Sequence, residues 1–139
     1  MLNVKDHKTE RFFDPWRYLG PKRRKLLDKS WAGLFREQIL DELPVNEVAK
    51  KFNQDLGRPT KELFTVTGAV LLQQLHDLTD EQTVGELAFN LQWHYALDIT
   101  EESDDAKYIC EKTLWSVREI MAQEGLDKKT FEKTADNLV

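Results

Sequence analysis

The chain has 139 residues, 40% hydrophobic and 32% charged, which is enough for one globular domain with a highly charged surface and too few for two. Its longest apolar run, Val66–Leu75, is far shorter than the roughly 20 residues of a membrane-spanning helix, so a membrane partner is excluded. The net charge of −5 argues against nucleic acid, but Met1–Lys61 carries 14 Lys and Arg against 9 Asp and Glu, whereas Glu62–Val139 carries 6 against 16.

The first 21 residues are predicted to form an irregular arm, because Pro15, Gly20 and Pro21 interrupt any helix. The arm is too apolar for a free tail, so we expect it to pack on the domain body. The residues that indicate this packing are Phe12, Phe13, Trp16, Tyr18 and Leu19.

One long helix is predicted from about Lys22 to Leu43, with Pro21 near its first turn and Pro44 at its end. Its apolar residues recur at helical spacing and predict one wide inward face, formed by Leu26, Leu27, Trp31, Leu34 and Phe35.

A short helix at about Asn46–Asn53 and a break at Gly57–Pro59 are predicted next. Thr60 is the expected N-cap of a third helix, about Lys61–His76, which is apolar on nearly every side. A helix of this kind lies at the centre of a bundle.

Thr79 and Gln82 form a predicted capping box at the start of a fourth helix, which is expected to continue to Tyr95. An acidic loop follows at Thr100–Asp105. The fifth helix is expected at about Glu111–Gln123, with Leu114, Val117 and Met121 inward and Gly125 just after its end, and a sixth begins at Thr130. The sequence therefore predicts an all-α fold, a single helical bundle of about five to six helices over residues 22–139.

No catalytic, metal or cofactor site is predicted. His7, His76 and His94 are isolated in the sequence, and the single Cys110 has no cysteine partner, which also favours a reducing cytoplasm. The chain has no glycine-rich phosphate loop and no nucleophile elbow.

A basic cluster at the start of the first predicted helix is the main candidate for binding. It comprises Lys22, Arg23, Arg24 and Lys25, with Lys29 one turn later. Cations at a helix N-terminus oppose the macrodipole, and Asp41 and Glu42 near the other end do the same, so this helix is not tuned for its own stability. Two explanations stay open: the cluster contacts DNA phosphates, or it pairs with the acidic second half of the same domain.

The fifth helix offers Lys112, Trp115 and Arg118 outside its inward stripe. With the preceding helix it could form a helix-turn-helix-like unit, although the connection from Ile99 to Glu111 is long for that motif. Arg58 and Lys61, near the start of the third helix, are further candidate phosphate contacts.

Four segments resemble the N-terminal domain of InsH-type insertion-sequence transposases: Leu43–Leu63, Leu71–Thr83, Phe89–Ile99 and Lys112–Glu119. The resemblance implies a helical domain that binds double-stranded DNA at the terminal inverted repeats of the element. In that family an RNase-H-like domain with the DDE triad follows, and the chain ends before one, so we expect no enzymatic activity.

Two functions are therefore considered. The first is DNA end recognition in transposition. The alternative is a protein-interaction module, without direct DNA binding, that pairs with itself, with full-length transposase or with a catalytic domain.

Overall fold

The computed structural model describes residues 2–8, 13–51, 61–126 and 132. These residues contain eight α-helices, two short 3-10 helices and no strand, which confirms the predicted all-α fold. The helices are α1 (Pro21–Lys29), α2 (Trp31–Gln38), α3 (Val45–Ala49), α4 (Leu63–His76), α5 (Asp80–Phe89), α6 (Leu91–Ala96), α7 (Asp104–Lys107) and α8 (Glu111–Gln123); the 3-10 helices are η1 (Arg17–Leu19) and η2 (Leu40–Glu42).

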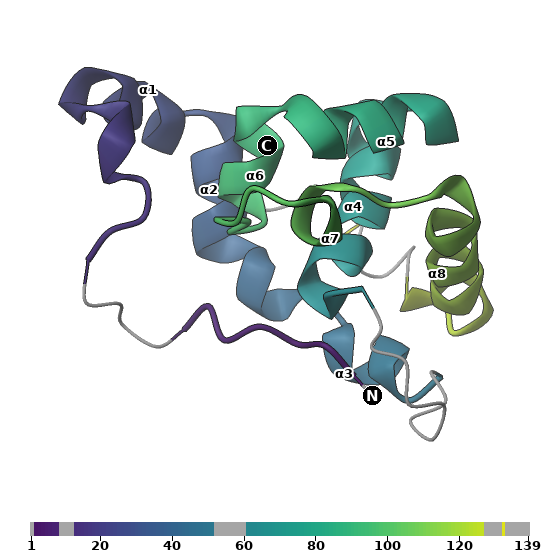
Figure 1. Cartoon of the computed structure of the whole chain (residues 1–139). Coiled ribbons are helices and arrows are strands. Elements are labelled where there is room, and N and C mark those ends of the chain that lie inside the picture. The colour runs from purple at the N-terminus through teal and green to yellow at the C-terminus, as the bar shows by residue number, and fades with distance from the viewer. Residues whose placement is uncertain (1, 9–12, 52–60, 127–131, 133–139) are drawn as a thin grey trace.

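Helix α4 lies in the middle of the bundle, as its apolar sequence predicts, and α3, α5 and α8 pack against it (Figure 1). Its N-cap is Glu62, whose carboxylate accepts hydrogen bonds from the backbone N–H groups of Phe64 and Thr65, each at 2.9 Å. A carboxylate at this position also interacts favourably with the helix dipole. The expected cap, Thr60, lies outside the described residues.

The prediction of one helix from Lys22 to Leu43 is wrong, because the chain changes direction at Ser30. Ser30 has an extended backbone, and its Oγ accepts a hydrogen bond from the Ala32 N–H at 3.2 Å. Serine is a favoured N-cap residue because its short side chain lets the hydroxyl oxygen accept a hydrogen bond from a backbone N–H of the first helical turn. Leu26, predicted to face inward, is 71% exposed on the shortened helix α1.

Gly33 allows α1 and α2 to pack closely after this turn. A Cβ atom at Gly33 would lie 2.2 Å from the backbone oxygen of Asp28, so only glycine permits the observed approach. The close packing of α1 against α2 therefore depends on the absence of a side chain at Gly33.

The fourth predicted helix is also divided. Its capping box at Thr79 and Gln82 is confirmed, but α5 ends at Phe89 and Asn90 caps a separate helix, α6, by accepting the Gln92 N–H at 2.8 Å. The predicted acidic loop contains the start of α7, which Ser103 caps. These breaks, with the one at Ser30, explain why more helices are present than the five to six predicted.

Helix α8 agrees with the prediction in bounds and in inward face. Leu114, Val117 and Met121 are fully buried, and Gly125 adopts a positive φ of 68° just after the helix. From the N-terminal arm, Trp16 and Leu19 enter the core, whereas Phe13 and Tyr18 stay exposed. The sixth predicted helix falls outside the part of the chain that the structure describes, apart from residue 132.

In the described part of the chain, no helix combines the length and apolar character needed to cross a membrane.

Candidate nucleic-acid interface

Helix α1 lies at one end of the molecule (Figure 1). Its exposed face is cationic. Lys22, Lys25 and Lys29 share this face with Leu26, because positions i, i+3, i+4 and i+7 align on a helix. Arg23, at the edge of the face, is exposed as well. The nine residues of α1 contain five cations and one anion.

The four exposed cations of α1, Lys22, Arg23, Lys25 and Lys29, share a second property. None of them makes an ion pair with a residue that the structure describes. The open explanation that the basic cluster pairs with the acidic half of the domain is therefore not supported for these four. Their charge is therefore not neutralised by an ion pair within the described part of the chain.

Arg24 differs from its neighbours because its side chain points back to the domain. Its guanidinium pairs with Asp14 at 2.5 Å, and its Nε donates to the Tyr95 hydroxyl at 3.0 Å. Tyr95 in turn donates to Asp28. Burial, together with this bond to Asp28, raises the pKa of Tyr95. Arg24 thus fastens α1 to the arm and to α6.

A second arginine, Arg36 of α2, completes this network. Its Nη1 donates to Asp98 Oδ1 and to the Tyr95 carbonyl oxygen, both at 2.9 Å, and its guanidinium stacks over the Tyr95 ring at 4.7 Å. Asp98 also accepts from Trp16 Nε1 at 3.3 Å, and it is buried with a φ of 54°. The network holds the arm, α1, α2 and the end of α6 in fixed positions beneath the cationic face.

Sequence reasoning missed most of this network. Arg36 and Asp98 are 62 residues apart, so no local spacing connects them. It also missed Arg17 and Tyr18, which are exposed in η1 immediately before α1 and extend the candidate surface. Their position beside the basic cluster in the sequence was the available signal.

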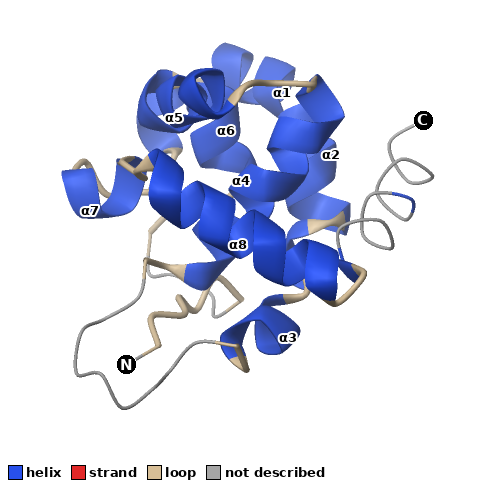
Figure 2. Cartoon of the chain, turned by 90° about the vertical axis from the view of Figure 1, so that its right-hand side faces the viewer, coloured by secondary structure: helices blue, strands red, loops and turns tan. Residues whose placement is uncertain are grey.

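The predicted contacts on α8 lie on the opposite side of the molecule from α1 (Figures 1 and 2). Arg118 is engaged within the fold: it donates to Asp80 at 2.6 Å and to Gln73 at 3.0 Å. These bonds from Arg118 and Gln73 lower the pKa of Asp80. Lys112 is exposed, and Trp115 is 54% exposed.

The predicted helix-turn-helix-like unit lacks the tight turn of that motif. Residues 97–110 connect α6 to α8, and they include α7. A helix-turn-helix joins its helices by three or four residues. Of the remaining candidates, Lys61 is half-buried beside the α4 N-cap, and Arg58 lies outside the described residues. The structure therefore groups the candidate contacts of α1 but separates them from those of α8.

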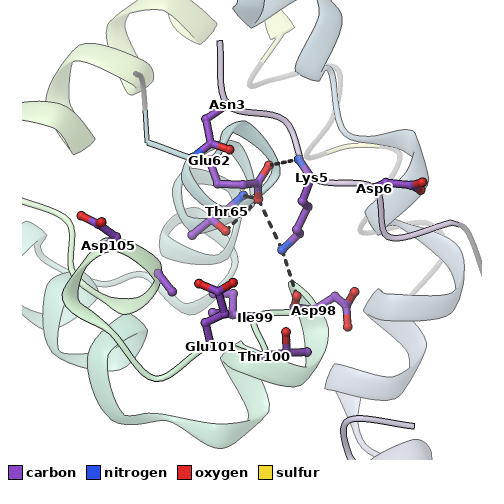
Figure 3. Close-up of a pocket in the computed structure, with 11 residues that line it drawn as sticks. Asn3, Lys5, Asp6, Glu62, Thr65, Asp98, Ile99, Thr100, Glu101 and Asp105 are labelled. Atoms are coloured by element: carbon purple, nitrogen blue, oxygen red, sulfur yellow. Dashed lines mark hydrogen bonds and ion pairs between the residues drawn. The ribbon is translucent and has the colours of Figure 1, made fainter. Parts of the chain in front are cut away.

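A pocket between the N-terminal segment, the start of α4 and α7 has a different chemistry (Figure 3). The Lys5 ammonium lies inside it, pairs with Glu62 at 3.3 Å and donates to the carbonyl oxygens of Leu97 and Asp98. The other charged residues that line it are acidic: Asp6, Glu62, Asp98, Glu101 and Asp105. This pocket would repel a phosphate, and the described residues contain no group of three or more ligands suited to a metal ion.

His94 and Cys110, to which the sequence assigns no catalytic or metal-binding role, make local hydrogen bonds. His94 is buried, and its Nε2 donates to the Leu87 carbonyl oxygen at 2.6 Å; burial lowers its pKa. Cys110 is exposed at the α8 N-cap, where the Thr113 hydroxyl lowers the pKa of the thiol.

The sequence matches the transposase domain family DUF772 over residues 25–119. The match covers more than half of the chain, and the chain belongs to this family, which implies a role in transposition. No curated protein and no solved structure matches it significantly.

Proposed function

We propose that this domain binds double-stranded DNA through the exposed face of α1 and recognises the terminal inverted repeats of an insertion element, as the InsH-type resemblance implies. The observation that carries the proposal is the set of four exposed cations on one short helix, Lys22, Arg23, Lys25 and Lys29, without ion-pair partners among the described residues. Family membership supplies the context of transposition.

Electrostatics favour α1 over α8 as the DNA surface. Each phosphate that a lysine or arginine neutralises releases condensed counterions, so a cluster of unpaired cations gives favourable binding even in a chain of net negative charge. On α8, by contrast, Arg118 is bonded to Asp80, and the acidic residues Glu111 and Glu119 accompany Lys112. Arg24 contributes by holding α1 in position rather than by contacting phosphate.

The test is fluorescence anisotropy with a labelled random-sequence duplex over a series of salt concentrations. The test variant replaces Lys22, Lys25 and Lys29 by Gln. Its control replaces Lys8, Lys50 and Lys51 by Gln, which removes three positive charges from exposed residues away from α1; of these, Lys51 pairs with Glu124 at 2.7 Å. Loss of three phosphate contacts is expected to reduce the slope of log K against log salt by about 2.7 in the α1 variant only.

Equal slopes for the α1 variant and its control would refute the proposed surface. Specificity is tested separately by selecting bound sequences from a random duplex pool. Enrichment of one sequence supports end recognition, whereas binding without enrichment limits the domain to sequence-independent DNA contact.

A further inference from the structure

The outer face of α8 carries an exposed tryptophan between two opposite charges. Lys112, Trp115, Glu119 and Ala122 follow one another at spacings of three, four and three residues, so they form a single stripe on the side opposite the buried Leu114, Val117 and Met121. Trp115 is 54% exposed at the middle of this stripe. We call these four residues the α8 stripe.

The two charges of the α8 stripe do not neutralise each other. Lys112 and Glu119 are seven residues apart, about 10 Å along the helix axis, which is too far for an ion pair within one helix. Neither residue makes an ion pair with another residue that the structure describes. Both charges are therefore without an ion-pair partner among the described residues.

The order of the stripe is self-complementary. Along α8 it runs positive, aromatic, negative, and an antiparallel second copy runs negative, aromatic, positive. A twofold axis between Trp115 and Ser116 places Lys112 of each copy opposite Glu119 of the other. The same axis brings the two Trp115 side chains together at the centre, as an isologous contact requires.

We infer that α8 forms a symmetric, antiparallel contact with α8 of a second copy of this chain. A central tryptophan flanked by complementary charges has the usual anatomy of an interaction hot spot. DNA is a less suitable occupant of this face, since Glu111 and Glu119 lie on α8 and the acidic segment Glu101–Asp105 precedes it. Because α1 lies on the opposite side of the molecule, the pairing leaves both cationic faces uncovered (Figures 1 and 2).

The test is sedimentation equilibrium of the full chain without DNA, so its outcome is independent of the proposed DNA binding. Wild type is expected to dimerise between micromolar and near-millimolar concentrations. Trp115→Ser is expected to weaken the dimer roughly thirtyfold or more, as for a hot-spot residue. Lys50→Glu, an exposed charge reversal on a different element, is the control and should leave the dimer unchanged.

Charge reversals test the antiparallel register. Lys112→Glu places two glutamates opposite each other at both symmetric positions, and Glu119→Lys does the same with two lysines, so each variant alone should dimerise roughly tenfold more weakly. A mixture of the two variants restores both pairs and should form heterodimers of near wild-type affinity. The variant with both reversals should also recover.

Three results would overturn the inference: a wild-type chain that stays monomeric at every concentration, a dimer that neither reversal weakens, or a mixture that associates no better than the single variants. Circular dichroism of each variant establishes that it is folded, so a loss of dimer cannot arise from unfolding.

Discussion

Three helical glycines in different surroundings allow the packing of α1 to be tested by one chemical change, Gly→Ala. Alanine is about 1 kcal/mol more favourable than glycine inside a helix, so the change stabilises the protein wherever the new methyl group has room. Gly85 in α5 has that room, since no neighbouring atom lies within 4 Å of the position that the methyl group would take. We expect Gly85→Ala to raise the free energy of unfolding by about 1 kcal/mol.

Gly33 is the opposite case. The added Cβ atom would lie 2.2 Å from the Asp28 backbone oxygen, and a backbone atom of a neighbouring helix cannot rotate away. Relief requires α1 to shift relative to α2. Overpacking costs about 1–3 kcal/mol, and contact with three backbone atoms of Asp28 within 2.7 Å places this site in the upper part of that range, at about 2–3 kcal/mol. The helix propensity of alanine offsets about 1 kcal/mol, so we expect a net destabilisation of about 1–2 kcal/mol.

Gly68 is intermediate. Its Cβ atom would approach Leu97 Cδ2 at 2.2 Å, but that atom is the end of a flexible side chain, which can move. We expect Gly68→Ala to lie between the other two variants. The measurement is urea unfolding followed by far-UV circular dichroism, with the slope on denaturant checked for constancy. A Gly33→Ala protein as stable as wild type would refute the close approach of α1 and α2.

Two further predictions concern polar contacts. Arg118→Met should lower the stability by about 1 kcal/mol at neutral pH, because Asp80 loses its ion pair in a partly exposed site, and should leave the salt slope of DNA binding unchanged. The pKa of Asp80 in the folded protein is lowered below 3.8, so this contribution is present above that pH and is lost as the pH falls through the folded-state pKa. The measurement is urea unfolding at neutral and at acidic pH. A loss of stability in Arg118→Met that persists at acidic pH would contradict the reasoning. The pKa of buried His94 is lowered below 6.5, so stability should be complete above that pH and fall below it, by at most about 1.4 kcal/mol per pH unit. His94→Gln should flatten this dependence, and a profile identical to wild type would contradict it.

Helices with a strong local signal could be predicted from the sequence. The continuous apolar character of α4, the capping box of α5 and the inward stripe of α8 each depend on residues within a few turns of one another, so periodicity and capping chemistry identify them. The breaks at Ser30 and Asn90 were missed because apolar residues continue at helical spacing across both. The break at Ser30 depends on tertiary packing, because the close approach of Gly33 to the Asp28 backbone exists only once α1 and α2 have packed together.

The candidate site was also predictable only where it depends on residues that are close together in the sequence. The basic cluster of α1 is contiguous, and composition alone identifies it. Which cations are available to a ligand depends on distant residues, since Arg24 is bonded to Tyr95, 71 residues away, and Arg118 to Asp80, 38 residues away. Counting charges along the sequence cannot make that distinction.

On α1 and α8 the distinction follows the chemistry of the two basic side chains, with the exposed Arg23 as the exception. The guanidinium groups of Arg24, Arg36 and Arg118 each bind two or more acceptors or an aromatic ring within the fold, a use that suits a planar group with five donors. The lysines of α1 are compact charges on flexible stems, suited to contacting a phosphate without a fixed geometry. Replacing an internal arginine by lysine would therefore disturb the fold at constant charge, whereas exchanging Lys22, Lys25 or Lys29 for arginine would preserve the fold and the cationic face together.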